Sequence, residues 1–116
     1  MRYVLLIYGP EASDAPGPSP EVDKLLAEYN HFTDDVRQRG VFEAGEGLQS
    51  ISTATTVRVK DGEVLTTDGP FAETKEQLGG FYLLDCKDLD EAIELAARMP
   101  HARFGSIEIR PVLDYS

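Results

Sequence analysis

Three stretches of the chain have the hydrophobic pattern of strands in one sheet. Residues 2–8 and 80–86 are apolar on both alternating faces, which is typical of strands buried on two sides. Residues 105–110 alternate between apolar and polar positions, as a strand with one wet face does. We therefore expect two central strands and one edge strand.

Two amphipathic helices are predicted between these strands. The first starts at Ser19-Pro20, a capping residue followed by a first-turn proline, and its apolar residues recur every three or four positions up to Gly40. The second starts after the capping residue Asp88 and should end near Pro100. Its apolar stripe is expected to consist of Leu89, Ala92, Ile93, Ala96 and Ala97.

A further strand and a hairpin lie in the middle of the chain. Residues 41–48 read as a strand that loosens into glycines. Residues 55–60 and 63–66 flank Asp61-Gly62, a preferred pair for a two-residue hairpin turn. In that register Val59 faces Val64.

The order of these elements is a split βαβ repeat with an added β-hairpin (βαββαβ), which predicts an α+β, ferredoxin-like fold with an antiparallel sheet. At 116 residues, the chain should form one domain over residues 1–116. Both helices would cover the same face of the sheet. Because the central strands are apolar on both faces, a monomer would leave a large apolar surface in water. We therefore predict a homodimer whose sheets pack face to face.

Composition and charge narrow the possible partners. The net charge of −10 opposes binding to nucleic acid or to an anionic membrane surface. The apolar run at residues 3–8 is too short to span a membrane and lacks the flanks of a secretory signal, so a cytoplasmic protein is expected. The single cysteine, Cys86, cannot form an internal disulfide. No motif predicts a metal site or a cofactor.

The segment from residue 67 to residue 80 concentrates the candidate chemistry. Asp68, Gly69 and Pro70 favour a rigid turn. Asp68 could act as a general base if a dimer buries it, because burial raises the pKa of a carboxyl; it could equally cap its own turn. The charged residues Glu73, Lys75 and Glu76 could bind a polar ligand or could form a solvated surface.

Four other side chains are weaker candidates. Tyr8, at the end of the first strand, could place a phenol in the pocket or in the dimer interface. Arg103 could pair with Asp68, with an acidic ligand, or in a structural salt bridge. His31 and His101 are both expected to be surface histidines, because neither has the spacing of a metal ligand.

Residues 67–81, TDGPFAETKEQLGGF, resemble the signature of the DGPF branch of YCII-related proteins. Residues 2–8, 45–48 and 103–112 also resemble that branch. The resemblance implies a ferredoxin-like subunit in a dimeric α+β barrel. It also implies a sigma-factor pathway, because genes of the DGPF branch often accompany extracytoplasmic-function sigma factors.

The wider YCII-like group includes small enzymes proposed to use a His-Asp pair. This chain has Pro18-Ser19-Pro20-Glu21 where the group places its histidine, and Met99-Pro100 where it places its aspartate. That mechanism therefore does not transfer.

These observations favour a homodimeric enzyme or enzyme-like protein that acts on a small molecule by acid/base chemistry, as lyases and isomerases do. Asp68 would be the acid/base, and Tyr8, Glu73, Lys75 and Glu76 would position the substrate. The alternatives are a non-catalytic binding or regulatory module and a purely architectural loop.

Overall fold

The computed structural model describes residues 1–10, 20–72 and 74–113. In chain order the elements are β1 (Arg2–Pro10), α1 (Pro20–Gln38), β2 (Phe42–Gly47), the 3-10 helix η1 (Ile51–Thr53), β3 (Thr55–Lys60), β4 (Glu63–Asp68), β5 (Glu76–Asp85), α2 (Leu89–Ala97), α3 (His101–Phe104) and β6 (Ser106–Pro111). None of these helices is long and apolar enough to cross a membrane.

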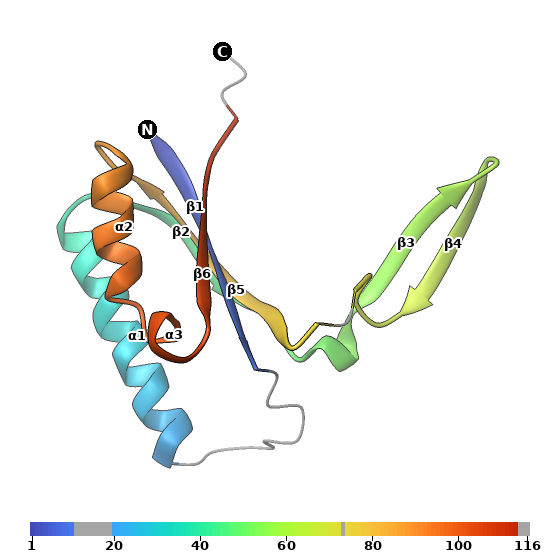
Figure 1. The fold of residues 1–116 in the computed structure, drawn as a ribbon, viewed down its shortest axis with the longest axis horizontal. Helices are drawn as coiled ribbons and strands as arrows, with labels where there is room; N and C mark the ends of the chain where they lie inside the picture. The colour runs from blue at the N-terminus through green and yellow to red at the C-terminus, as the bar shows by residue number, and fades with distance from the viewer. Residues whose placement is uncertain (11–19, 73, 114–116) are drawn as a thin grey trace.

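Four strands form the main sheet, in the order β2-β5-β1-β6, and each pair of neighbouring strands is antiparallel. The strands predicted to be central, β1 and β5, lie in the middle, and the predicted edge strand β6 lies at an edge (Figure 1). This strand order, with helices in the two crossovers, confirms the α+β, ferredoxin-like fold.

The core lies between one face of the sheet and the helices. Alternate residues of the two central strands are buried there, Tyr3 and Leu5 in β1 and Tyr82 and Leu84 in β5. The helical residues packed against them are Phe32, Val36, Ala92, Leu95, Ala96 and Met99. Both helices therefore cover the same face, as predicted.

The opposite face of the sheet is apolar but only half-buried. It is formed by Val4, Leu6 and Tyr8 of β1 and by Phe81 and Leu83 of β5. Here this surface is called the open face. Within the described part of the chain, the helices pack on the other face of the sheet.

The two helices differ from the predicted pattern in which residues they bury. In α1 only Phe32 and Val36 are buried, while Leu26 is 57% exposed, because the first half of the helix stands over a cavity. In α2 the predicted stripe is partly wrong. Ala92 and Ala96 are buried, but Leu89 and Ile93 are exposed and Leu95 is fully buried.

A short helix follows Pro100 where the sequence predicted only a helix end. Proline is tolerated at a helix start, where its missing N–H has no intrahelical partner, and α3 (His101–Phe104) begins directly after it. The buried side chains of Met99 and Pro100 fix this segment against the core. His101 is thereby held beside the sheet.

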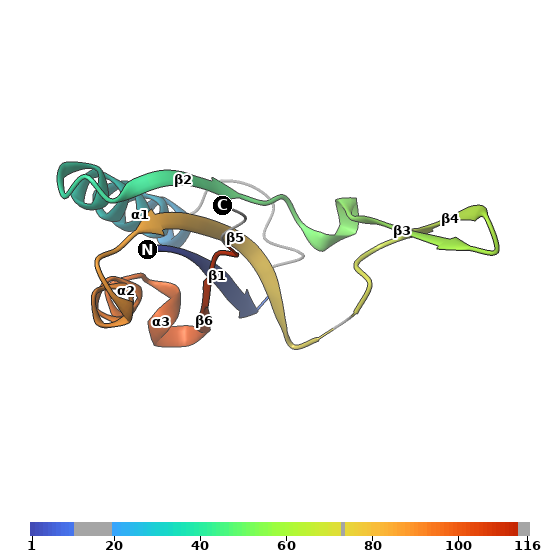
Figure 2. The same ribbon diagram turned by 90° about the horizontal axis from the view of Figure 1, so that it is seen from above.

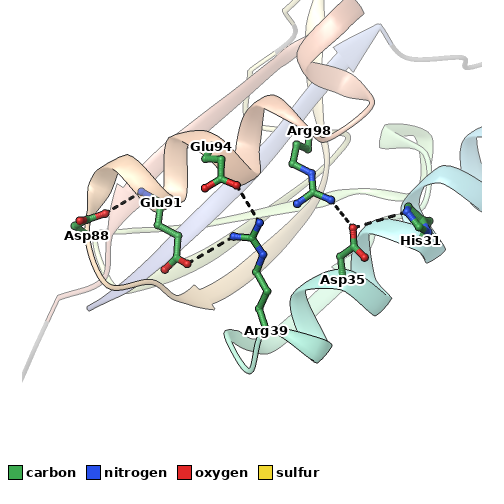
Figure 3. A network of polar contacts seen from close by, with 7 residues as sticks. All are labelled: His31, Asp35, Arg39, Asp88, Glu91, Glu94 and Arg98. Carbon is green, nitrogen blue, oxygen red and sulfur yellow. Dashed lines mark hydrogen bonds and ion pairs between the residues drawn. The ribbon is translucent and has the colours of Figure 1, made fainter.

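Ion pairs join α1 to α2 along their outer surfaces (Figure 3). Arg39 contacts Glu94 at 2.9 Å and Glu91 at 3.7 Å, and Arg98 contacts Asp35. Exposed pairs of this kind contribute little to stability, because water and salt screen them. They align the two helices, while the buried residues supply most of the stability.

Asp88 caps α2, as the sequence predicted. Its carboxylate accepts a hydrogen bond from the backbone N–H of Glu91 at 2.9 Å. Replacing Asp88 with alanine should lower the free energy of unfolding by about 1 kcal/mol, measured by urea denaturation. Asp90→Ala is the matched control, because it removes the same charge from the same turn without removing the cap. Equal losses in the two variants would contradict a capping role.

The hairpin β3–β4 forms a separate two-stranded sheet with the predicted register, in which Val59 pairs with Val64. Its two turn residues, Asp61 (52°) and Gly62 (80°), both have positive φ, as a two-residue type I′ turn requires. Figures 1 and 2 show the hairpin extending away from the sheet and helices. The radius of gyration, 16.1 Å, accordingly exceeds the value of about 13 Å expected for a compact domain of this length.

Candidate functional site

A cavity of about 510 Å³ lies between the first half of α1 and the sheet. Leu25 and Leu26 of α1 form one wall, and Ile7 and Tyr82 of the central strands contribute to the other. The cavity exists because α1 packs tightly on the sheet only at its second half. Its size and its largely apolar walls are those of a small-molecule site.

Tyr29 and His101 form a hydrogen-bonded pair in the wall of this cavity. The Tyr29 hydroxyl and the His101 Nδ1 share a short hydrogen bond, and both residues line the cavity wall. Burial raises the pKa of Tyr29 to about 12 and lowers the pKa of His101. At neutral pH both groups are therefore uncharged. A phenol that donates to Nδ1 leaves the imidazole proton on Nε2.

The position of His101 depends on a glycine in β1. A β-carbon at Gly9 would lie 2.6 Å from Cδ2 of the imidazole ring, a distance that real atoms do not adopt. On its other side, the ring lies against Phe104 at 4.6 Å and Tyr29 at 5.6 Å between centroids. The imidazole is thus enclosed between β1, α1 and α3.

A second hydroxyl pair lies deeper in the same cavity. The Thr33 hydroxyl donates to the Tyr29 carbonyl oxygen at 2.9 Å and lies 2.6 Å from the Tyr82 hydroxyl. With the Thr33 proton used in this way, the Tyr82 hydroxyl is the donor to Thr33. Burial raises the pKa of Tyr82, so it too is neutral. This pair fixes the turn of α1 that carries Tyr29.

Among the described lining residues of this cavity, the charged ones are Arg37 and Glu46. The Arg37 guanidinium lies over the Phe42 ring at 4.8 Å, and both side chains line the cavity. Within residues 1–10, 20–72 and 74–113 it makes no ion pair with a carboxylate. It therefore remains available to an acidic ligand.

Asp68, Lys75 and Glu76, which were predicted from the 67–80 segment, do not line this cavity. Asp68 is the last residue of β4 and is exposed at the base of the hairpin. Lys75 is also exposed, and Glu73 lies outside the described residues. Among the described lining residues of the cavities, neither Asp68 nor Lys75 occurs. The catalytic role of Asp68 stays a prediction.

Tyr8 and Glu76 meet in a second cavity, of about 570 Å³, between the sheet and the base of the hairpin. The Glu76 carboxylate accepts a hydrogen bond from the Ser106 hydroxyl at 2.7 Å. Gln77 lines both cavities, and its side-chain amide donates to the Thr74 carbonyl at 2.7 Å. The two cavities are therefore neighbours.

Arg103 forms a salt bridge with Glu28 of α1 at 2.8 Å, one of the arrangements that the sequence left open. The hydrogen bond from Arg103 lowers the pKa of the Glu28 carboxyl. This contact ties α3 to α1 next to the Tyr29–His101 pair. A substrate-binding role for Arg103 stays a prediction.

His31 is on the surface, as predicted, with its side chain 80% exposed, but the same prediction was wrong for His101. Tyr29 lies on the apolar stripe of α1, so its inward direction was predictable. Its hydrogen-bond partner lies 72 positions later, in a helix that the sequence did not predict. No local pattern could pair the two.

The match to a known family covers the whole chain. The model of the YCII-related domain matches residues 1–116. The chain belongs to the YCII-related family. A relative that aligns over nearly its full length is "Uncharacterized protein R00369" of Rhizobium meliloti (strain 1021), which is 38% identical over 122 residues, covering 99% of this chain and 94% of the relative. The resemblance is confirmed for the family, and the DGPF branch within it stays a prediction.

Proposed function

We propose that this YCII-related protein binds a small molecule in the cavity between α1 and the sheet and transfers a proton with Tyr29 and His101. The observation that carries the proposal is the direct hydrogen bond between the Tyr29 hydroxyl and the His101 imidazole in a cavity wall. A phenol and an imidazole in contact form a proton donor and a proton acceptor at one point.

The pair can move a proton without leaving an isolated charge. As the Tyr29 oxygen takes a proton from a substrate carbon, its own proton passes to Nδ1 of His101. The products are a neutral phenol, an imidazolium and the substrate anion next to it. The reverse transfer returns a proton to the substrate, so the pair serves as base and then as acid.

The walls of the cavity indicate the class of substrate. Most lining side chains are apolar or glycine, and Arg37 supplies a guanidinium. Arginine recognises carboxylates through paired N–H donors. We therefore propose a small organic acid with an apolar body and a C–H group next to a carbonyl.

Proton transfer can be tested before the net reaction is known. In D2O, the protein should speed deuterium incorporation next to the carbonyl of 4-oxopentanoate, followed by proton NMR, and act less on its methyl ester. Tyr29→Phe and His101→Gln should each slow this exchange by about a hundredfold or more. His31→Gln, which removes an exposed imidazole, should leave the rate unchanged.

Three results would point elsewhere. If the wild-type protein causes no exchange while 4-oxopentanoate shifts the His101 imidazole resonances, the non-catalytic binding alternative is supported. If neither occurs with this acid or with 2-oxo acids of four to eight carbons, as probes of about the cavity's size, the proposal fails. If Asp68→Asn removes exchange and His101→Gln does not, the acid/base role returns to Asp68.

We also propose that two copies of this chain form a homodimer. The open face keeps five apolar side chains half-exposed, although such surfaces are usually buried in an interface. If the open faces of two copies pack against each other, each one covers the other. A two-fold axis allows this, because it places the same surface of each copy in the interface.

A further inference from the structure

The β3–β4 hairpin, here called the arm (residues 55–68), has one apolar face that the rest of the described chain leaves uncovered. The register places Val59 opposite Val64 and Val57 opposite Thr66 on that face. Val57, Val59 and Val64 are 59%, 68% and 67% exposed. The other face carries charged residues, including Arg58 and Lys60. Such alternation is typical of a strand pair that packs against another surface.

The arm needs a supporting surface to be stable. A two-stranded hairpin on its own is at best marginally stable in water. The β3–β4 ladder and the hydrogen bond from the N–H of Gly69 to the carbonyl of Ala54 at 2.7 Å join the two strands of the arm to each other. In Figures 1 and 2 the arm points away from the sheet and helices, so it cannot use them as support.

We propose that the valine face of the arm lies on a second copy of this chain. Residues 1–10, 20–72 and 74–113 leave two apolar surfaces of each chain without cover, this face and the open face, and a two-fold dimer can cover both. The charge distribution agrees, because residues 55–68 contain two basic and three acidic side chains in a chain of net charge −10. An arm that carries little of the chain's negative charge meets less repulsion from an acidic copy than a strongly acidic segment would.

The arrangement would also close the second cavity. That cavity lies between the base of the arm and the sheet and is lined by Tyr8 of the open face and by Phe71, which is 81% exposed. A copy that contacts the arm and the open face would cover its mouth. The site around Tyr8 and Glu76 would then be complete only in the dimer.

The arm's role is tested by sedimentation equilibrium on paired substitutions. Val59→Thr with Val64→Thr replaces one cross-strand pair of the valine face by residues that favour strands, so the hairpin should remain folded. Its dimer dissociation constant should rise about tenfold or more. Arg58→Gln with Leu65→Thr changes the directly paired residues of the other face and should leave the constant nearly unchanged.

The inference rests on the proposed homodimer, and a third variant separates the two. Val4→Thr with Leu83→Thr changes a paired position of the open face. If this variant dissociates while the Val59/Val64 variant stays as tight as wild type, the dimer stands and the arm's role is refuted. A wild-type protein that is monomeric at about 100 µM refutes both.

Hydrogen exchange on the wild-type protein gives an independent measurement. Amides of β3 and β4 should exchange more slowly above the dissociation constant than below it, because association stabilises the arm. Equal exchange at both concentrations would overturn the inference, even if a variant fails to fold.

Discussion

Replacing Gly105 with alanine should lower the free energy of unfolding by about 1–3 kcal/mol, the usual cost of forcing an extra group into a packed site. A β-carbon at this position would lie 2.2 Å from the carbonyl oxygen of Tyr8 and 3.1 Å from Cα of Gly9. Both are backbone atoms of β1, so neither can turn aside. The φ of −143° at Gly105 suits any residue, so the loss comes from this contact alone.

The same substitution should disturb the candidate site. Gly105 ends α3 by donating its N–H to the carbonyl of His101 at 2.8 Å. Moving α3 away from β1 would bring His101 into water. Because burial lowers the pKa of His101, exposure should raise it toward that of a solvated histidine, as NMR titration would show.

Gly47→Ala is the matched control, since a β-carbon there would meet no atom within 4 Å. Guanidinium denaturation of the two variants and the wild type gives the comparison. Equal stability of Gly105→Ala and Gly47→Ala would show that β1 and α3 are less tightly packed than the structure indicates.

The sheet was predictable from the sequence because strand patterns are local. The two-faced apolar runs of β1 and β5 marked the central strands, and Asp61-Gly62 set the register of the hairpin. The hairpin's direction was not predictable. Alternation shows that the face with Val57, Val59 and Val64 is apolar, but it does not show whether the chain's own sheet covers it.

The cavity was less predictable than the sheet because it arises from contacts between distant segments. The sequence favours Asp68 and its charged neighbours as the site, because these residues are adjacent in the chain. The structure instead brings Tyr29 of α1 to His101 of α3, at a point where Gly9 leaves room for the ring. None of these three residues has a sequence neighbour that reveals the others.

Helix α2 provides the second large effect, because the sequence and the structure differ on which of its residues support the core. The sequence stripe included Ile93, whereas the structure buries Leu95 completely and leaves Ile93 49% exposed. Both residues fit a helical period. The difference arises because Leu95 shares a ridge with Ala92 and Met99, which face the sheet.

Leu95→Ala should therefore lower the free energy of unfolding by about 2–5 kcal/mol, through lost apolar burial and the void left behind. Ile93→Ala removes a side chain of similar size from the same helix and should cost less than about 1 kcal/mol, since half of it is already in water. Urea denaturation of both variants shows which face of α2, the one with Leu95 or the one with Ile93, contributes more to the free energy of unfolding. The opposite order of losses would mean that α2 is rotated, and that α3, which follows it directly, does not hold His101 against Tyr29.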